Sequence, residues 1–234
     1  MSFTVINPAT GEKLKEIPAW SDTQIEAALA EAAAIAPQWA ATPIAERSEL
    51  MQRAAQVLRD NADQYAAIVT QEMGKLLRDA KAEVEKCAWV CDYYAQEGAH
   101  FLQDEPIESD AGKSYVAYLP IGTVLAVMPW NFPFWQVFRF AAPALVAGNT
   151  GLLKHASNVP QCALAIEEVF HKAGFPQGVF RSLMIRASQV ANVIGDRRVH
   201  AVTLTGSEPA GRQVASTAGN NLSLIHISEP TRPY

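Results

Sequence analysis

The hydrophobic pattern of the chain changes character near residue 113. In the first part, apolar residues recur at the three- and four-residue spacing of amphipathic helices. Two short β-like runs come before them, and the Gly and Pro residues between the two runs are typical of a hairpin or an extended arm. These runs are Thr4–Ile6 and Lys13–Ile17. Four helices are predicted. The first opens at Ser21 and the second at Thr42, and the third and fourth cover Asn61–Met73 and Leu77–Leu102.

After a polar loop at Asp104–Lys113, short apolar runs alternate with helix-like segments. Alternation of strands with helices of this length is typical of βαβ units, whose parallel sheet is covered on both faces. We therefore predict an α/β fold with a doubly wound, Rossmann-like parallel sheet. The predicted strands are Ser114–Leu119, Thr123–Met128, Thr150–Lys154, Gly178–Ile185 and Ala201–Leu204. The predicted helices are Phe134–Ala147, Pro160–Ala173, Ser188–Ile194 and Glu208–Ala218.

These patterns divide the chain into three parts. Residues 1–112 form an N-terminal arm with helices, and residues 113–222 form a nucleotide-binding α/β region that makes one domain with the preceding helices. Residues 223–234 form a tail of different character, which we leave out of the fold prediction.

The most informative stretch is Val124–Asn149, which is predicted to form a buried strand, a turn and an apolar helix. In open α/β sheets, ligands bind where strands end and loops begin. The turn carries Asn131 between two prolines and bulky aromatic residues. An amide in such a place has two donor hydrogens for an oxygen that gains charge. The alternative is an asparagine that caps the following helix.

Composition narrows the class of protein. The chain has 234 residues, 49% hydrophobic and 18% charged, which is ordinary for a soluble globular protein. Its net charge of -5 argues against nucleic acid or an anionic membrane as partner, since both bind basic surfaces. No apolar run reaches the roughly 20 residues that span a bilayer, and the N-terminus does not resemble a secretory signal.

The cysteines and histidines predict a cellular location and argue against a metal site. The three cysteines contain no C-x-x-C pair, which favours a reduced, cytoplasmic setting. Cys87 and Cys91 lie four residues apart on one predicted helix, and we interpret them as small, buried hydrophobic residues. The histidines show no spacing typical of metal ligands, so we predict no metal site.

Six motifs together resemble the aldehyde dehydrogenase superfamily. The first is Met128–Pro133, reading MPWNFP, and the other five occur in family order and spacing across residues 5–221. We call Trp130–Pro133 the signature loop. The other five motifs are Asn7–Glu12, Glu72–Lys75, Pro143–Thr150, Gly174–Val179 and Thr203–Ser207 with Gly211.

The resemblance implies a reaction. The family oxidises an aldehyde to an acid: a cysteine attacks the carbonyl, hydride passes to a nicotinamide, and a glutamate base helps water to hydrolyse the thioester. The resemblance places the Asn131 amide as the donor to the tetrahedral oxygen of the thiohemiacetal. Cys87, Cys91 and Cys162 do not follow the Gly-x-x-Cys context of the family nucleophile, so we nominate none of them.

The resemblance also assigns a site for NADP or NAD. Lys154 would contact the adenosine ribose, and small residues after a strand would let the backbone approach the pyrophosphate. The family often has a glutamate where this chain has Ser157; a carboxylate would repel a 2′-phosphate, so we expect NADP to be accepted. The cofactor-binding candidates are Met128, Pro129, Trp130, Asn131, Lys154, Ser157, Gly206, Ser207 and Gly211.

Within the family, Met128–Val137 and Leu153–Val159 are most similar to bacterial succinate-semialdehyde dehydrogenases. That substrate has a distal carboxylate, and Arg139 on the helix after the signature loop is the candidate partner; a surface arginine is the alternative. The resemblance further implies a small aldehyde substrate and a homo-oligomer.

The chain departs from the family at its end. The family continues through a Leu-Glu-Leu-Gly-Gly segment with the glutamate base and, later, the catalytic cysteine. Here residues 223–234 instead resemble translated sequencing adapter. We therefore expect an N-terminal fragment without nucleophile, base or catalytic domain, and no oxidation of aldehyde by it. A non-catalytic nucleotide-binding or structural module is the alternative function.

Overall fold

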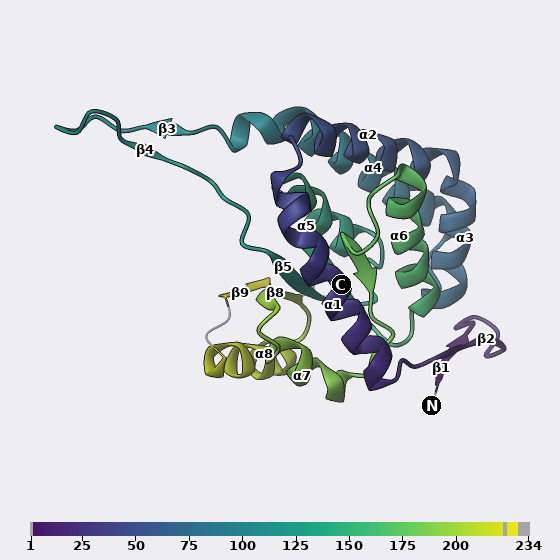
Figure 1. The fold of residues 1–234 in the computed structure, drawn as a ribbon. Coiled ribbons are helices and arrows are strands. Elements are labelled where there is room, and N and C mark those ends of the chain that lie inside the picture. Colours follow the sequence, from purple (N-terminus) through teal and green to yellow (C-terminus); the bar gives the residue numbers. More distant parts are fainter. Residues whose placement is uncertain (1, 222–223, 229–234) are drawn as a thin grey trace.

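A five-stranded parallel sheet lies at the centre of the molecule (Figure 1). The computed structural model describes residues 2–221 and 224–228. The strands run in the order β7-β6-β5-β8-β9, and every neighbouring pair is parallel. This confirms the predicted α/β class with a Rossmann-like sheet. The strands are β5 (Thr123–Met128), β6 (Thr150–His155), β7 (Phe180–Ser182), β8 (Val199–Thr205) and β9 (Leu224–Ser228).

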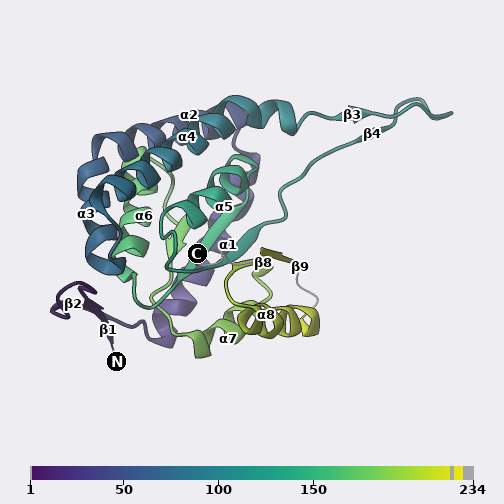
Figure 2. The ribbon, with the colours of Figure 1, turned by 180° about the vertical axis from the view of Figure 1, so that it is seen from behind.

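Helices cover both faces of this sheet. One face carries α5 and α6, with α2, α3 and α4 packed outside them, and the other carries α1, α7 and α8 (Figures 1 and 2). The helices are α1 (Asp22–Ala41), α2 (Ile44–Asp60), α3 (Ala62–Met73), α4 (Leu77–Phe101), α5 (Trp135–Val146), α6 (Pro160–Ala173), α7 (Val190–Ile194) and α8 (Glu208–Asn220). A single 3₁₀ turn, Ala187–Gln189, leads into α7.

Alternation along the strands explains this layering, because successive side chains of a strand point to opposite faces. Leu125 and Leu152 pack in the hydrophobic cluster under α1, α7 and α8. Ala126 and Leu153, one residue further along, pack in the cluster under α5 and α6. Both faces of the sheet are therefore buried, which accounts for the nearly continuous apolar runs in β5 and β6.

The predicted N-terminal arm is a hairpin. Strand β1 (Ser2–Ile6) pairs antiparallel with β2 (Lys13–Pro18). The helix predicted to open at Ser21 begins with a capping box: the backbone N–H of Gln24 donates to Ser21 Oγ, and the Gln24 side chain accepts from the backbone N–H of Ser21.

Arg47 joins the helical layer to the α/β part. Its side chain is buried, and its Nε donates to the Val146 carbonyl at 2.8 Å, near the end of α5. Its Nη1 donates to the carbonyls of Ala40 and Thr42 at the end of α1. One guanidinium thus pairs with carbonyls that two helix ends leave unsatisfied.

Two predicted strands are shorter than expected. Of Ser114–Leu119, only β4 (Tyr115–Val116) pairs, and its partner β3 (Glu105–Pro106) lies in the segment predicted as a loop. This hairpin projects from the body, and Leu119 is 81% exposed (Figures 1 and 2). An alternating pattern gives a long strand only where one face is buried, and here neither face is. Of Gly178–Ile185, only the three residues of β7 pair with β6.

The tail contributes a strand that the fold prediction left out. Strand β9 runs parallel to β8, with Ala201 paired to Leu224 at one end and Thr205 paired to Ser228 at the other. The sequence Leu-Ile-His-Ile-Ser is rich in β-formers, and the edge of β8 presents unpaired backbone groups. The rest of the tail, residues 223 and 229–234, and Leu222 lie outside the described residues. The likeness of 223–234 to adapter sequence and the domain boundaries at 112 and 222 stay predictions.

Candidate functional site

The ends of three neighbouring strands meet at one edge of the sheet. Met128 pairs in register with His155, and Val127 pairs with Leu204. The loops that follow β5, β6 and β8 therefore start side by side. They carry the signature loop, Ser157 and Gly206–Ser207, so the structure brings these predicted site residues to the edge where open α/β sheets bind ligands.

Asn131 is half-buried in the signature loop, and Trp130 beside it is 47% exposed. It does not cap the following helix. The backbone N–H groups at the start of α5, those of its N-cap residue Phe134 and of Trp135, donate to Glu83 Oε1 at 2.8 and 2.9 Å. Within the part of the chain that the structure describes, no group hydrogen-bonds to the Asn131 amide, so its donors remain available for a ligand oxygen.

His155, at the end of β6, is a residue whose role sequence reasoning missed. Its ring is buried, and burial lowers its pKa to about 4, so it is neutral at pH 7. The backbone N–H of Ala156 donates to Nδ1 at 2.9 Å. The proton is therefore on Nε2, which donates to the carbonyl of Pro133 in the signature loop, also at 2.9 Å.

A cavity of about 580 Å³ lies beside the end of β6. It contains two of the predicted cofactor residues, Lys154 and Ser157, together with Arg186 and Ser188 from the loop before α7. Burial lowers the pKa of Lys154. Two cations and several hydroxyl groups around one cavity suit a phosphate group. Arg186 was not predicted; its only sequence signal is a basic residue just after a strand that ends at this edge.

A narrower apolar slot of about 140 Å³ adjoins this cavity, and Lys154 lines both. Its walls come from β5 and β8 on one side and from α7 and α8 on the other. Such a slot suits a flat aromatic ring. The apolar walls are Val127, Val190, Ile194, Leu204 and Val214.

The predicted Gly206, Ser207 and Gly211 lie next to this slot, where β8 passes into α8. Ser207 is the N-cap residue of α8 and makes no side-chain cap hydrogen bond. The backbone N–H of Gly211, which is buried, donates to the Ser207 carbonyl at 2.9 Å. The first turn of α8 thus presents backbone N–H groups beside the slot, an arrangement that favours an anion.

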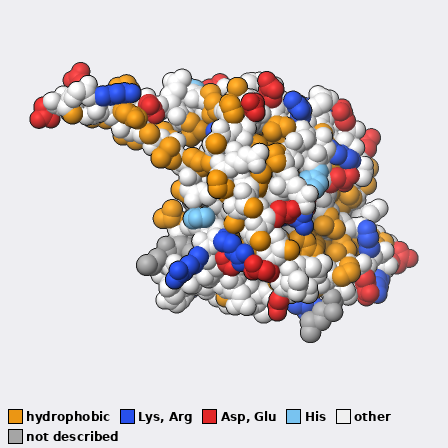
Figure 3. Space-filling view, in the orientation of Figure 1, with side chains coloured by type: hydrophobic (Ala, Val, Ile, Leu, Met, Phe, Trp, Pro, Cys, Tyr) orange, Lys and Arg blue, Asp and Glu red, His pale blue; other side chains and the backbone are white. Residues whose placement is uncertain are grey.

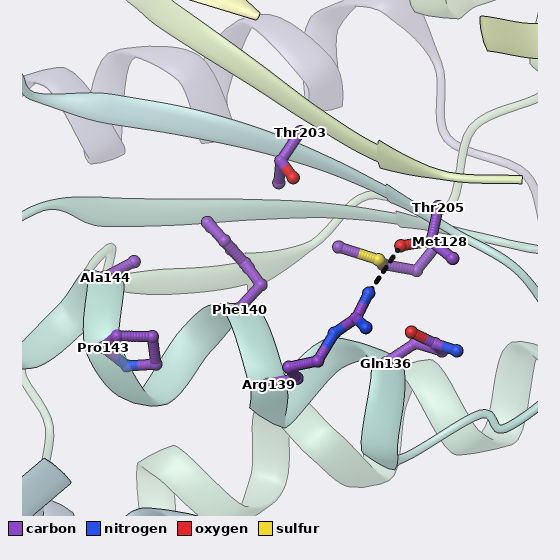
Figure 4. Close-up of a pocket in the computed structure, with 8 residues that line it drawn as sticks. All are labelled: Met128, Gln136, Arg139, Phe140, Pro143, Ala144, Thr203 and Thr205. Atoms are coloured by element: carbon purple, nitrogen blue, oxygen red, sulfur yellow. Dashed lines mark hydrogen bonds between the residues drawn. The ribbon is translucent and has the colours of Figure 1, made fainter. Parts of the chain in front are cut away.

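Met128 and Arg139 line a different cavity, of about 430 Å³, on the α5 side of the sheet (Figure 4). Arg139 is exposed at this cavity, and its Nη2 donates to Thr205 Oγ1 at 3.2 Å. Gln136, from the same helix, is 1% exposed, and its Oε1 has no hydrogen-bond partner in the described structure. The cavity therefore offers a cation and an amide to a polar ligand.

None of the three cysteines is placed for nucleophilic chemistry. All three are fully buried, and burial raises the pKa of each thiol: Cys87, Cys91 and Cys162. Among residues 2–221 and 224–228, no cluster of three or more potential metal ligands occurs, and no helix is long and apolar enough to cross a membrane.

The known proteins to which this chain is similar include several succinate-semialdehyde dehydrogenases. A probable succinate-semialdehyde dehydrogenase [NADP(+)] of Synechocystis sp. is 50% identical over 222 residues, which are 95% of this chain and 49% of that protein. Succinate-semialdehyde dehydrogenase [NADP(+)] 1 of Mycobacterium bovis is 49% identical over 225 residues, with the same two coverages. The crystal structure of the succinic semialdehyde dehydrogenase from Streptococcus pyogenes in complex with NADP+ superposes with a TM-score of 0.93 at 38% identity. It is matched over 96% of this chain and 50% of that chain.

The chain spans about half the length of the curated relatives it matches. The family model described as "Aldehyde dehydrogenase family" matches residues 1–228, which include the signature loop and all three cavities. The α/β fold with its parallel sheet agrees with this match. The chain belongs to the aldehyde dehydrogenase family.

Proposed function

We propose that this chain is the cofactor-binding part of an NAD(P)-dependent aldehyde dehydrogenase, with NADP as favoured cofactor. The observation that carries the proposal is the cavity that places Lys154, Ser157 and Arg186 together beside the apolar slot. The relatives named above carry NADP(+) in their names, and the Streptococcus pyogenes structure contains NADP+.

The residues present fit that cofactor. The slot between Val190 and Val214 would take the adenine ring, and the two cations would bind the 2′-phosphate. Ser157 adds a hydroxyl without the negative charge that a glutamate would bring to this place. The first turn of α8, after Gly206 and Ser207, would receive the pyrophosphate. When bound, the nicotinamide accepts the hydride of the aldehyde.

Asn131 supplies the electrostatic part of the mechanism. When a thiol attacks the aldehyde carbon, the carbonyl oxygen becomes an oxyanion, and an amide N–H that is already positioned stabilises it without reorganisation. Because Glu83 accepts the first N–H groups of α5, the Asn131 amide is not occupied as a helix cap. The nucleophile and the base of this reaction would come from the part of the complete enzyme that this chain does not span.

We further propose succinate semialdehyde as the substrate of the complete enzyme, bound at its distal carboxylate by Arg139. To test this, residues 1–221 are joined to the remaining C-terminal half of the Synechocystis relative, giving the fusion protein. In it, Arg139→Met is expected to raise KM for succinate semialdehyde about 10- to 100-fold, since a charge-assisted hydrogen bond contributes about 1.5–3 kcal/mol. KM for butanal, which has no carboxylate, should change by less than about twofold. Equal effects on both aldehydes would rule out the assignment.

The enzyme is also proposed to act in the cytoplasm as a homo-oligomer. Figure 3 shows apolar side chains on the projecting hairpin and the face beside it. Ile107, Tyr115 and Leu119 are among the exposed residues of this segment. An apolar surface of this kind on a soluble protein is typical of a protein–protein contact.

The cofactor proposal is tested by calorimetric titration of the purified chain with NADP+ and NAD+. We expect NADP+ to bind more tightly than NAD+. If neither nucleotide binds, the chain is not a cofactor-binding unit. If nucleotides bind but the fusion protein does not oxidise any aldehyde, the alternative of a non-catalytic nucleotide-binding module is favoured.

A further inference from the structure

The signature loop and the start of α5 that follows it are contacted by charged and polar side chains from outside this strand–loop–helix unit. The loop lies between β5 and α5, whereas these side chains belong to the α3–α4 region and to the end of β6. Lys75, Glu83 and His155 are the residues involved. Lys75 is the last residue of the motif Glu72–Lys75, which spans the end of α3 and takes no part in the proposed cofactor site.

Glu83 links α4 to the start of α5. Its side chain is 1% exposed, and its Oε1 accepts from the backbone N–H groups of Phe134 and Trp135. These are the first two residues after the signature loop. A carboxylate at this position satisfies donors that a helix start leaves unpaired and interacts favourably with the helix dipole. The carboxylate therefore fixes the point at which the loop enters α5.

Lys75 contacts both Glu83 and the loop itself. Its Nζ lies 2.5 Å from Glu83 Oε2 and 3.5 Å from the centroid of the Phe132 ring. The ion pair neutralises a carboxylate that would otherwise be buried with its charge uncompensated. The ring contact is a cation–π interaction, which is stronger where the cation is desolvated, and the Lys75 side chain is only 13% exposed.

The backbone before Lys75 explains why this lysine reaches the loop. Gly74 ends α3 in the left-handed region, at φ +75°. A Cβ there would also lie 3.1 Å from Pro8 Cγ of the N-terminal hairpin. Glycine is thus required at the turn that brings Lys75 from the end of α3 toward Phe132.

His155 contacts the loop from the sheet side. Its Nε2 donates to the Pro133 carbonyl, and its Nδ1 is occupied by the N–H of Ala156. The same strand end carries Lys154, which lines the cavity proposed to bind the 2′-phosphate. The last residue of the loop is therefore tied to the strand that forms the proposed cofactor site.

We propose that Lys75, Glu83 and His155 are positioning residues that fix the signature loop, and with it the Asn131 amide, from two sides. Asn131 lies between the ring that Lys75 contacts and Trp130, while its own amide has no partner in the described structure. Its orientation thus depends on how its neighbours are fixed. For its catalytic meaning, this inference rests on the proposed function above.

Glu72 provides a matched control. It is also a buried glutamate, 3% exposed, and its carboxylate accepts from the N–H groups of Gln161 and Cys162 at the start of α6. It therefore performs the same capping task as Glu83 on a helix that does not follow the signature loop. Glu72→Gln should lower stability as Glu83→Gln does, without affecting the loop.

The experiment uses the whole chain labelled with 5-fluorotryptophan, with the Trp130 fluorine signal assigned through Trp130→Phe. We expect Lys75→Met, Glu83→Gln and His155→Leu each to shift or split the Trp130 signal. Each should also weaken NADP+ binding about tenfold, the size of one lost hydrogen bond, without changing the affinity for adenosine 2′,5′-bisphosphate, which lacks the nicotinamide half. Lys75→Arg should restore both readouts, because arginine keeps the ion pair and the ring contact.

In Glu72→Gln we expect the Trp130 signal to be unchanged. If it is also unchanged in all three variants, the inference is overturned, and Lys75, Glu83 and His155 have only a structural role. Lys75→Met and Lys75→Arg decide the question even if the two more deeply buried residues prove indispensable for folding. If the unsubstituted chain fails to bind NADP+, the proposed function fails, whereas the fluorine signal still decides whether these residues position the loop.

Discussion

Replacing Asn131 with alanine in the fusion protein is expected to lower kcat for succinate semialdehyde by about 100- to 1,000-fold, the usual cost of losing one oxyanion donor. The reason is electrostatic: the amide N–H acts where negative charge develops, so its loss is felt mainly in the transition state. Steady-state kinetics measure the effect. KM and the affinity for NADP+ should change much less than kcat, by about tenfold at most.

The structure separates this role from a structural one. Glu83 accepts the first N–H groups of α5, so Asn131→Ala should change the thermal midpoint of the chain little. Asn131→Asp keeps the size of the side chain but places a negative charge near the oxyanion, and should be at least as damaging to kcat as alanine. A fall in stability with kcat retained would instead make Asn131 a loop-forming residue.

Introducing glutamate at Ser157 is expected to weaken NADP+ binding to the chain about 100-fold and to leave NAD+ binding unchanged or stronger. A carboxylate in the cavity would pair with Lys154 and Arg186 and would repel a 2′-phosphate, and such like-charge contacts cost several kcal/mol. The same carboxylate accepts hydrogen bonds from a free ribose 2′-hydroxyl. Calorimetric titration with both nucleotides measures the change in preference.

Ser157→Ala is the matched control, because it removes the hydroxyl without adding charge and should weaken NADP+ binding only about three- to tenfold. The affinity of the unsubstituted chain for NADP+ should also fall with added salt, because two cations meet a dianionic phosphate. If Ser157→Glu binds NADP+ as well as the unsubstituted chain does, the 2′-phosphate is bound elsewhere.

Much of the fold follows from the sequence because its signals are local. The period of apolar residues, the capping box at Ser21 and the glycines after α3 and α6 each act within a few residues. These signals correctly predicted the parallel sheet and the loop after β5. They did not predict the short pairing of β3 with β4 or the strand β9, since both depend on what lies beside them in space.

The same distinction applies to the candidate site. Lys154, Ser157 and the signature loop were found because they lie at or just after the ends of predicted strands, in a family-like order. Arg186 was missed, since its sequence position alone does not show that it shares a cavity with Lys154. His155 was not nominated, because the histidines show no spacing typical of metal ligands; only the packed structure shows its hydrogen bond to Pro133.

The sequence by itself thus determined the order of strands and helices from β5 to α8, the loop that carries Asn131 and the membership in a family. The tertiary structure decided which side chains act on that loop. Glu83 accepts a hydrogen bond from the backbone N–H of Phe134, 51 positions later, and His155 contacts a carbonyl 22 positions before it. The physical reason is range. Periodicity and turn chemistry act between neighbours in the chain, whereas hydrogen bonds and ion pairs form between groups that meet in space with suitable geometry, however far apart they are in the sequence.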